Sequence, residues 1–150
     1  MPRPKPIVPR SDQKLAPWQR LALSAEILWS YATVRWAMRR EDLPAALARL
    51  RTTSSGPRHP ALGHTVEADD LAARRIGYAV MAILRLLPTD GRCLMQSLVL
   101  TRLLARRRLT SSVVIGVTAA PEFSAHAWVE YAGRPLLPAY GPVFARLVEL

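Results

Sequence analysis

The residue types that could do chemistry in this chain are its only cysteine, Cys93, and a histidine further along, His126. Cys93 opens a run that predicts a helix, and His126 lies in a strand-like segment, SAHAWVEY. A thiol nucleophile and the imidazole that takes its proton are often supplied by two separate elements. At a helix N-terminus, free backbone N–H groups and the positive dipole end favour a thiolate. The N–H groups of Cys93 and Leu94 can also bind the oxyanion that forms when a thiolate attacks a carbonyl.

One Cys and one His are a weak signal, so a competing interpretation stays open. In that interpretation the cysteine is buried and structural, and the histidine is a core residue with its hydrogen bonds satisfied. A single cysteine forms no intramolecular disulfide and builds no zinc site alone. His59 and His64 lie in a loop rich in Ser, Thr, Gly and Pro without a cysteine nearby, so solvated side chains are the better interpretation. We expect no metal and no cofactor.

Helices must position Cys93. Apolar spacings of three and four predict helices over residues 16–40, 41–51, 66–87 and 92–107. Thr65 is the expected N-cap of the third helix, and Thr89 or Asp90 is a candidate cap of the fourth. The fourth helix is apolar nearly all round, so we expect it to be central. On the first helix one apolar stripe is expected to face the core rather than to form a ligand box: Trp18, Leu21, Ala22, Ala25, Leu28, Trp29, Ala32 and Trp36.

Strands must position His126. Residues 112–118 and 124–131 read as strands, Ala132 and Gly133 suit a hairpin turn, and residues 134–138 would return antiparallel. The tail from residue 140 closes as a short helix or an extended segment. The predicted organisation is a disordered Pro/Arg-rich tail over residues 1–14 and a single α+β domain over 15–150. Within that domain, residues 15–87 form the helical part and 88–150 the catalytic helix and a small antiparallel sheet.

The chain is basic, with 21 Lys and Arg against 11 Asp and Glu and a net charge of +10. Two accounts stay open: the composition of a GC-rich genome, or a negatively charged partner. The cluster Arg106–Arg108 either complements the helix dipole or binds substrate. The proline-rich first residues show no secretory signal, and Glu26 and Arg35 interrupt the most apolar window. We therefore expect a cytoplasmic protein without membrane insertion.

Three segments together, CLMQSLVLTRLLARRR, VVIGV and FSAHAWVEYAGRPL, resemble the transglutaminase-like cysteine peptidases of lasso-peptide biosynthesis. The resemblance covers about residues 85–137. It implies a papain-like or transglutaminase-like fold, Cys93 as nucleophile and His126 as base and acid. It also implies removal of the leader from a ribosomally made precursor peptide, with a separate leader-recognition protein and the lasso cyclase as expected partners.

The sequence departs from the family where an acidic third member is expected, because Pro138 stands there and no carboxylate follows until Glu149. Glu130 lies on the face of the histidine but roughly 13 Å along the strand, which makes it a poor orienter. A main-chain carbonyl, Asp90, Glu122 or a side chain of a partner remains as a candidate. Losing this member usually leaves a slower catalyst.

Other functions stay open. A catalytically weakened homologue could act as a scaffold, and a basic module could bind peptide or nucleic acid. We disfavour nucleic acid because the tryptophans are not interleaved with basic residues and no recognition motif occurs. A transglutaminase-type acyl transfer would use the same thioester chemistry, although the resemblance implies water as the acceptor.

Overall fold

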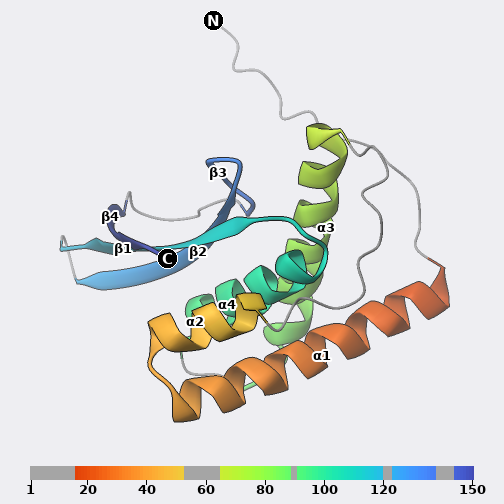
Figure 1. Cartoon of the computed structure of the whole chain (residues 1–150), viewed down its shortest axis with the longest axis horizontal. Helices are drawn as coiled ribbons and strands as arrows, with labels where there is room; N and C mark the ends of the chain where they lie inside the picture. The colour runs from red at the N-terminus through yellow and green to blue at the C-terminus, as the bar shows by residue number, and fades with distance from the viewer. Residues whose placement is uncertain (1–15, 53–64, 89–90, 120–122, 138–143) are drawn as a thin grey trace, which may run out of the picture.

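The computed structural model describes residues 16–52, 65–88, 91–119, 123–137 and 144–150. Within these ranges the chain forms an α+β domain, as predicted (Figure 1). The helices and strands are α1 (Pro17–Arg40), α2 (Leu43–Thr52), α3 (Val66–Leu84), α4 (Arg92–Arg106), β1 (Ser111–Thr118), β2 (Ser124–Tyr131), β3 (Arg134–Pro135) and β4 (Ala145–Glu149). The predicted tail over 1–14 and the loop histidines His59 and His64 lie outside the described residues.

Helix α4 is the centre of the domain, as its apolar circumference predicts. It contacts the other three helices, α1, α2 and α3, and the strands β1 and β2. Every residue from Ser97 to Leu104 is buried. Figure 1 shows the sheet and α1 on opposite sides of α4. The two faces of α4 therefore join the helical part and the sheet into one core.

The sheet is antiparallel, with the strand order β3-β2-β1-β4. A tight turn joins β2 to β3, and its two residues, Ala132 and Gly133, have φ values of +50° and +72°. These left-handed conformations match the twist of a two-residue hairpin, which confirms the predicted turn. The C-terminal segment is extended and pairs with β1, which decides between the two predicted forms of the tail.

The predicted inner face of α1 is wrong. Its buried residues are Ile27, Ser30, Val34 and Ala37. The predicted stripe points outward instead, and Trp18 and Trp29 are each 69% exposed. The physical reason is that α1 is apolar on two opposite faces. Spacing identifies both faces, but it does not say which one the rest of the core will cover.

Two helix ends also differ from the prediction. Helix α3 ends at Leu84 rather than Leu87, because the N–H groups of Leu86 and Leu87 donate to carbonyls three residues back and tighten the last turn. Pro88 then disfavours a helical residue before it. Helix α4 has Gly91 as its N-cap, with φ +60° and no side-chain cap, instead of Thr89 or Asp90.

Side chains cap the starts of α3 and α2; the cap of α3 was predicted, and the cap of α2 was not. The hydroxyl of Thr65 accepts a 3.3 Å hydrogen bond from the N–H of Ala68, which confirms Thr65 as the N-cap of α3. The carboxylate of Asp42 caps α2 by accepting a 3.1 Å bond from the N–H of Ala45, so α2 begins slightly later than predicted. None of the helices described is both long and apolar enough to cross a membrane.

Candidate functional site

The start of α4 presents Cys93 and a set of free backbone donors. Gly91 precedes the helix, and its carbonyl accepts from the N–H of Met95 at 3.0 Å. The N–H groups of the residues between them, Cys93 and Leu94 included, belong to the first turn of α4, where N–H groups have no partner within the helix. The thiol of Cys93 is half-buried and free. Its carbonyl accepts a 2.9 Å hydrogen bond from the hydroxyl of Ser97, which fixes the first turn from within.

His126 lies on β2 directly opposite Gly116 of β1. Its ring stacks on Trp128, with centroids 6.1 Å apart and 18° between the planes. On Phe144 the centroid distance is 5.3 Å and the planes are tilted by 30°. Burial among these groups lowers the pKa of His126 from its ordinary value of 6.5. The neutral imidazole, which is the form that accepts a thiol proton, is therefore favoured at neutral pH.

Gly116 makes room for this aromatic packing. A Cβ at this position would lie 2.9 Å from the Cβ of Phe144 and 2.9 Å from the ring atoms Cη2 and Cζ3 of Trp128. With any other residue, one of the two rings or β1 itself would have to move. The glycine therefore matters for the space it leaves, and its backbone conformation is unremarkable.

Glu130 forms a hydrogen bond with Trp128, one of the two aromatic residues packed on His126. It is buried, with 6% of its surface exposed, and its Oε1 accepts from the indole N–H of Trp128 at 2.9 Å. Arg146 of β4 donates to the same oxygen at 2.6 Å. Glu130 thus reaches His126 only through Trp128, in line with the expectation that it is a poor orienter. Among the described residues, none forms a hydrogen bond with the imidazole.

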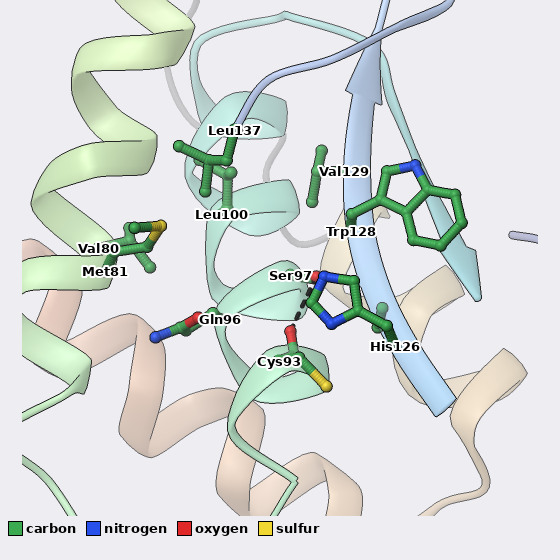
Figure 2. Close-up of a pocket in the computed structure, with 11 residues that line it drawn as sticks. Val80, Met81, Cys93, Gln96, Ser97, Leu100, His126, Trp128, Val129 and Leu137 are labelled. Carbon is green, nitrogen blue, oxygen red and sulfur yellow. Dashed lines mark hydrogen bonds between the residues drawn. The ribbon is translucent and has the colours of Figure 1, made fainter. Parts of the chain in front are cut away.

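Cys93 and His126 line one pocket of about 260 Å³ (Figure 2). The pocket lies between α3, α4 and β2, and Figure 2 shows the imidazole on the strand side and the thiol at the start of the helix. Most of the other residues around it are apolar: Val80, Met81, Gln96, Ser97, Leu100, Ala127, Trp128, Val129 and Leu137. The pocket thus offers an apolar side chain a place beside a thiol and an imidazole.

Leu137 closes one wall of the pocket, and two features of α3 hold it there. Gly77 is close-packed against it, since a Cβ at Gly77 would lie 3.0 Å from Cδ2 of Leu137. Arg74 donates at 3.2 Å to the carbonyl of Leu136, and its Nε bonds Asp70 at 2.8 Å. The chain after β3 is thereby tied to α3 at the edge of the pocket.

The position expected to carry a third catalytic member follows this wall in the sequence. Pro138 comes directly after Leu137, but Pro138, Asp90 and Glu122 lie outside the described residues. Glu149, the next carboxylate along the chain, is exposed on β4 and faces Arg146 at 3.6 Å. Nowhere in the described part of the chain do three His, Cys, Asp or Glu side chains gather closely enough to hold a metal ion.

Two members of the arginine cluster serve the fold. Arg106 and Arg107, at the end of α4, bond the carboxylate of Glu26 on α1, with distances of 3.1 Å to Arg106 and 2.6 Å to Arg107. Burial alone would raise the pKa of Glu26, but these hydrogen bonds and charges outweigh it, so the pKa lies below 4.5. Neither arginine lines the pocket. Arg108 is exposed in a left-handed conformation, with φ +61°.

Sequence reasoning missed part of this site. The period of two on β2 places His126, Trp128 and Glu130 on one face, and the hairpin pairing could have placed Gly116 opposite the histidine. Phe144 had no such signal, because the extended form of the tail was undecided.

The fold and the site agree with a comparison to known families. The family model described as the transglutaminase-like superfamily matches residues 27–148, well over half of the chain. The chain therefore belongs to the transglutaminase-like superfamily, which commonly includes cysteine peptidases and transglutaminases. The matched range extends beyond the resemblance over 85–137 and takes in most of α1, α2 and α3. Comparisons with curated proteins and with solved structures found no match.

Proposed function

We propose that this protein is a cysteine peptidase that removes the leader from a ribosomally made lasso-peptide precursor. The observation that carries the proposal is the shared pocket: Cys93, at a helix N-terminus with free N–H groups, and His126, on a strand, line the same apolar cavity. Membership of the transglutaminase-like superfamily supports the thiol chemistry. The lasso-peptide substrate is supported by the sequence resemblance.

The first half of the reaction forms an acyl-enzyme. The imidazole of His126 takes the thiol proton of Cys93, and the sulfur attacks the carbonyl carbon of the scissile peptide bond. The carbonyl oxygen becomes an oxyanion, which the N–H groups of Cys93 and Leu94 stabilise. The C–N bond then breaks, the imidazolium gives its proton to the leaving amine, and the acyl group remains on Cys93 as a thioester.

The second half of the reaction hydrolyses the thioester and regenerates the free enzyme. His126, neutral again, takes a proton from water, and the hydroxide attacks the thioester carbonyl. The C–S bond breaks, the carboxylic acid leaves, and the proton returns to the sulfur. No metal or nucleotide enters either half. An amine in place of water would give a transglutaminase-type amide instead, so the acceptor must be tested.

The pocket suggests what part of the substrate it receives. Val80, Leu100, Val129 and Leu137 surround it with hydrocarbon, which favours an apolar side chain next to the cleaved bond. The high positive charge of the chain would steer an acidic leader or an acidic leader-recognition protein during encounter. We expect cleavage to depend on that separate protein, as the resemblance implies.

The test is a cleavage assay that separates these steps. A synthetic precursor peptide is incubated with the protein, with and without a candidate leader-recognition protein, and the products are identified by mass spectrometry. We expect one cut, lost in Cys93→Ala and His126→Ala. A set of reactions with added primary amine distinguishes the acceptor, because an amide product in place of the free acid would identify acyl transfer. Cleavage that survives Cys93→Ala would refute the proposal.

A second candidate function is a scaffold derived from the peptidase fold. Two observations favour it. The imidazole of His126 forms no hydrogen bond with any of the described residues, and Pro138 stands in the sequence where the family has an acidic residue. A scaffold predicts that Cys93→Ala supports precursor maturation by the other enzymes as well as the wild type does.

A further inference from the structure

The side of α1 that points away from the core carries an apolar stripe that the described elements leave exposed, apart from Arg49 of α2, whose guanidinium lies 4.9 Å from the ring centroid of Trp36. We call it the outer stripe of α1, and its members are all exposed: Trp18, Leu21, Ala22, Ala25, Leu28, Trp29, Ala32 and Trp36. The exposed fractions are 69% for Trp18, 74% for Leu21 and 69% for Trp29. Single exposed apolar residues are normal on a protein, but a continuous row of this kind marks an interaction surface.

The spacing within the outer stripe is that of a helix–helix seam. Six members follow one another at intervals of 4, 3, 4, 3 and 4 residues: Trp18, Ala22, Ala25, Trp29, Ala32 and Trp36. This is the alternation of a and d positions in a heptad, whose natural partner is another helix. The row from Trp18 to Trp36 is about 27 Å long at 1.5 Å per residue, which is enough for several turns of contact.

Large and small residues are mixed along this seam, with alanines standing between the tryptophans. The alanines leave shallow positions between the tryptophans, and these would receive large side chains from a facing helix as knobs in holes. Such positions contribute nothing to binding a membrane surface, because lipid tails do not pack as knobs into holes. Leu21 and Leu28 widen the stripe on one side without breaking the pattern. The shape therefore favours a protein helix over a bilayer.

The charges beside the stripe are positive. Arg35 and Arg40 are exposed at its borders, and the guanidinium of Arg40 lies 4.6 Å from the ring centroid of Trp36. Glu26, the acidic residue on the same helix, is already bonded to Arg106 and Arg107. A second copy of the chain would bring the same positive charges to the contact, whereas a partner with carboxylates would neutralise them.

We propose that the outer stripe of α1 binds an acidic amphipathic helix of a partner protein, with large apolar residues along its seam and carboxylates facing Arg35 and Arg40. The stripe shares no residue with the pocket of Cys93 and His126. This inference therefore goes beyond the proposed peptidase function and stands or falls separately from it.

The probe is a synthetic helical peptide of about three heptads, with Leu at a and d and Glu at e and g. Two control peptides carry the same residues in permuted order, or Lys in place of Glu. Binding is followed by isothermal titration and by the emission of the tryptophans, which should shift to the blue as water leaves them. We expect Trp29→Ala to weaken binding about tenfold or more, as a central aromatic anchor does. Tyr78→Ala, which removes an aromatic residue 52% exposed on α3, is the matched control and should not change it.

Charge reversal sharpens the test. In the double variant Arg35→Glu and Arg40→Glu, the Glu peptide should lose affinity and the Lys peptide should gain it. Equal binding of the permuted peptide, or no binding of the Glu peptide, would overturn the proposal. Three other partners could occupy the stripe: a second copy, detected as a homodimer in sedimentation, a phosphatidylserine vesicle, or an oligonucleotide. If one of them binds in a Trp29-dependent way and more tightly than the Glu peptide does, the proposal is also overturned. Loss of peptide binding with intact Cys93 chemistry would leave the proposed function untouched.

Discussion

Replacing Gly116 by alanine is expected to loosen the aromatic packing around His126. The new Cβ would come within 2.9 Å of the Cβ of Phe144 and of two ring atoms of Trp128. Neither contact is the free end of a flexible chain, so the rings or β1 must move. Both rings touch the imidazole, at centroid distances of 5.3 Å and 6.1 Å, and a shift of either one admits water to it.

The size of the effect follows from this overlap. Overpacking in a close-packed site costs about 1–3 kcal/mol of unfolding free energy. For a chain of 150 residues each kcal/mol lowers the melting temperature by about 2–4 °C, so we expect a loss of about 2–12 °C. Because burial lowers the pKa of His126, hydration should also raise that pKa back toward 6.5.

The assay combines thermal unfolding with alkylation of Cys93 as a function of pH. Gly133→Ala is the matched control, because Gly133 has φ +72° but no atom within 4 Å of a Cβ. It should cost about 1 kcal/mol through backbone strain alone. Both variants should therefore have a lower melting temperature than the wild type, but only Gly116→Ala should change the pH profile of alkylation. A Gly116→Ala protein with wild-type stability and a wild-type profile would refute the reasoning.

Three further predictions concern stability and are checked by urea unfolding. Glu26→Gln should lower the unfolding free energy by about 1 kcal/mol, a value discounted for solvent because Arg106 and Arg107 are partly exposed; an unchanged midpoint would mean that this link between α1 and α4 contributes nothing. Arg108→Gly should raise stability by up to about 1 kcal/mol, since φ +61° strains any residue with a Cβ; a loss instead would show that the arginine side chain matters more. Because burial lowers the folded-state pKa of His126 below 6.5, the unfolded chain binds the proton more readily, and stability should fall as pH drops below 6.5 toward that lowered pKa. His126→Gln should flatten the pH dependence in this window, and an equally steep dependence in the variant would contradict the assignment.

The elements that carry the candidate site were predictable because local chemistry determines them. The period of two in SAHAWVEY and the Ala132-Gly133 turn define β2 and the strand after it, and the structure has both. The apolar circumference of residues 92–107 required a central helix, so Cys93 had to lie at the edge of the core. Pairing these two elements needed the tertiary fold, which the family resemblance supplied.

Other features depended on contacts between distant residues and were not visible in the sequence. The orientation of α1 is the clearest case, because both of its apolar faces satisfy the helical period and only packing against the other helices selects Ile27 and Val34. The roles of Gly116 and Phe144 depend on how β4 pairs with β1. Glu26 looked only like an obstacle to membrane insertion, and its bonds to Arg106 and Arg107 span α1 and α4.

The central claim is that His126 activates the thiol of Cys93, and alkylation of the folded protein tests it most directly. The rate of reaction with iodoacetamide is followed against pH in the wild type and in His126→Ala. We predict that the wild-type rate persists well below the free-thiol pKa of about 8.5 and falls in the variant. A rate that titrates like an ordinary thiol and is indifferent to His126 would contradict the claim and favour the scaffold.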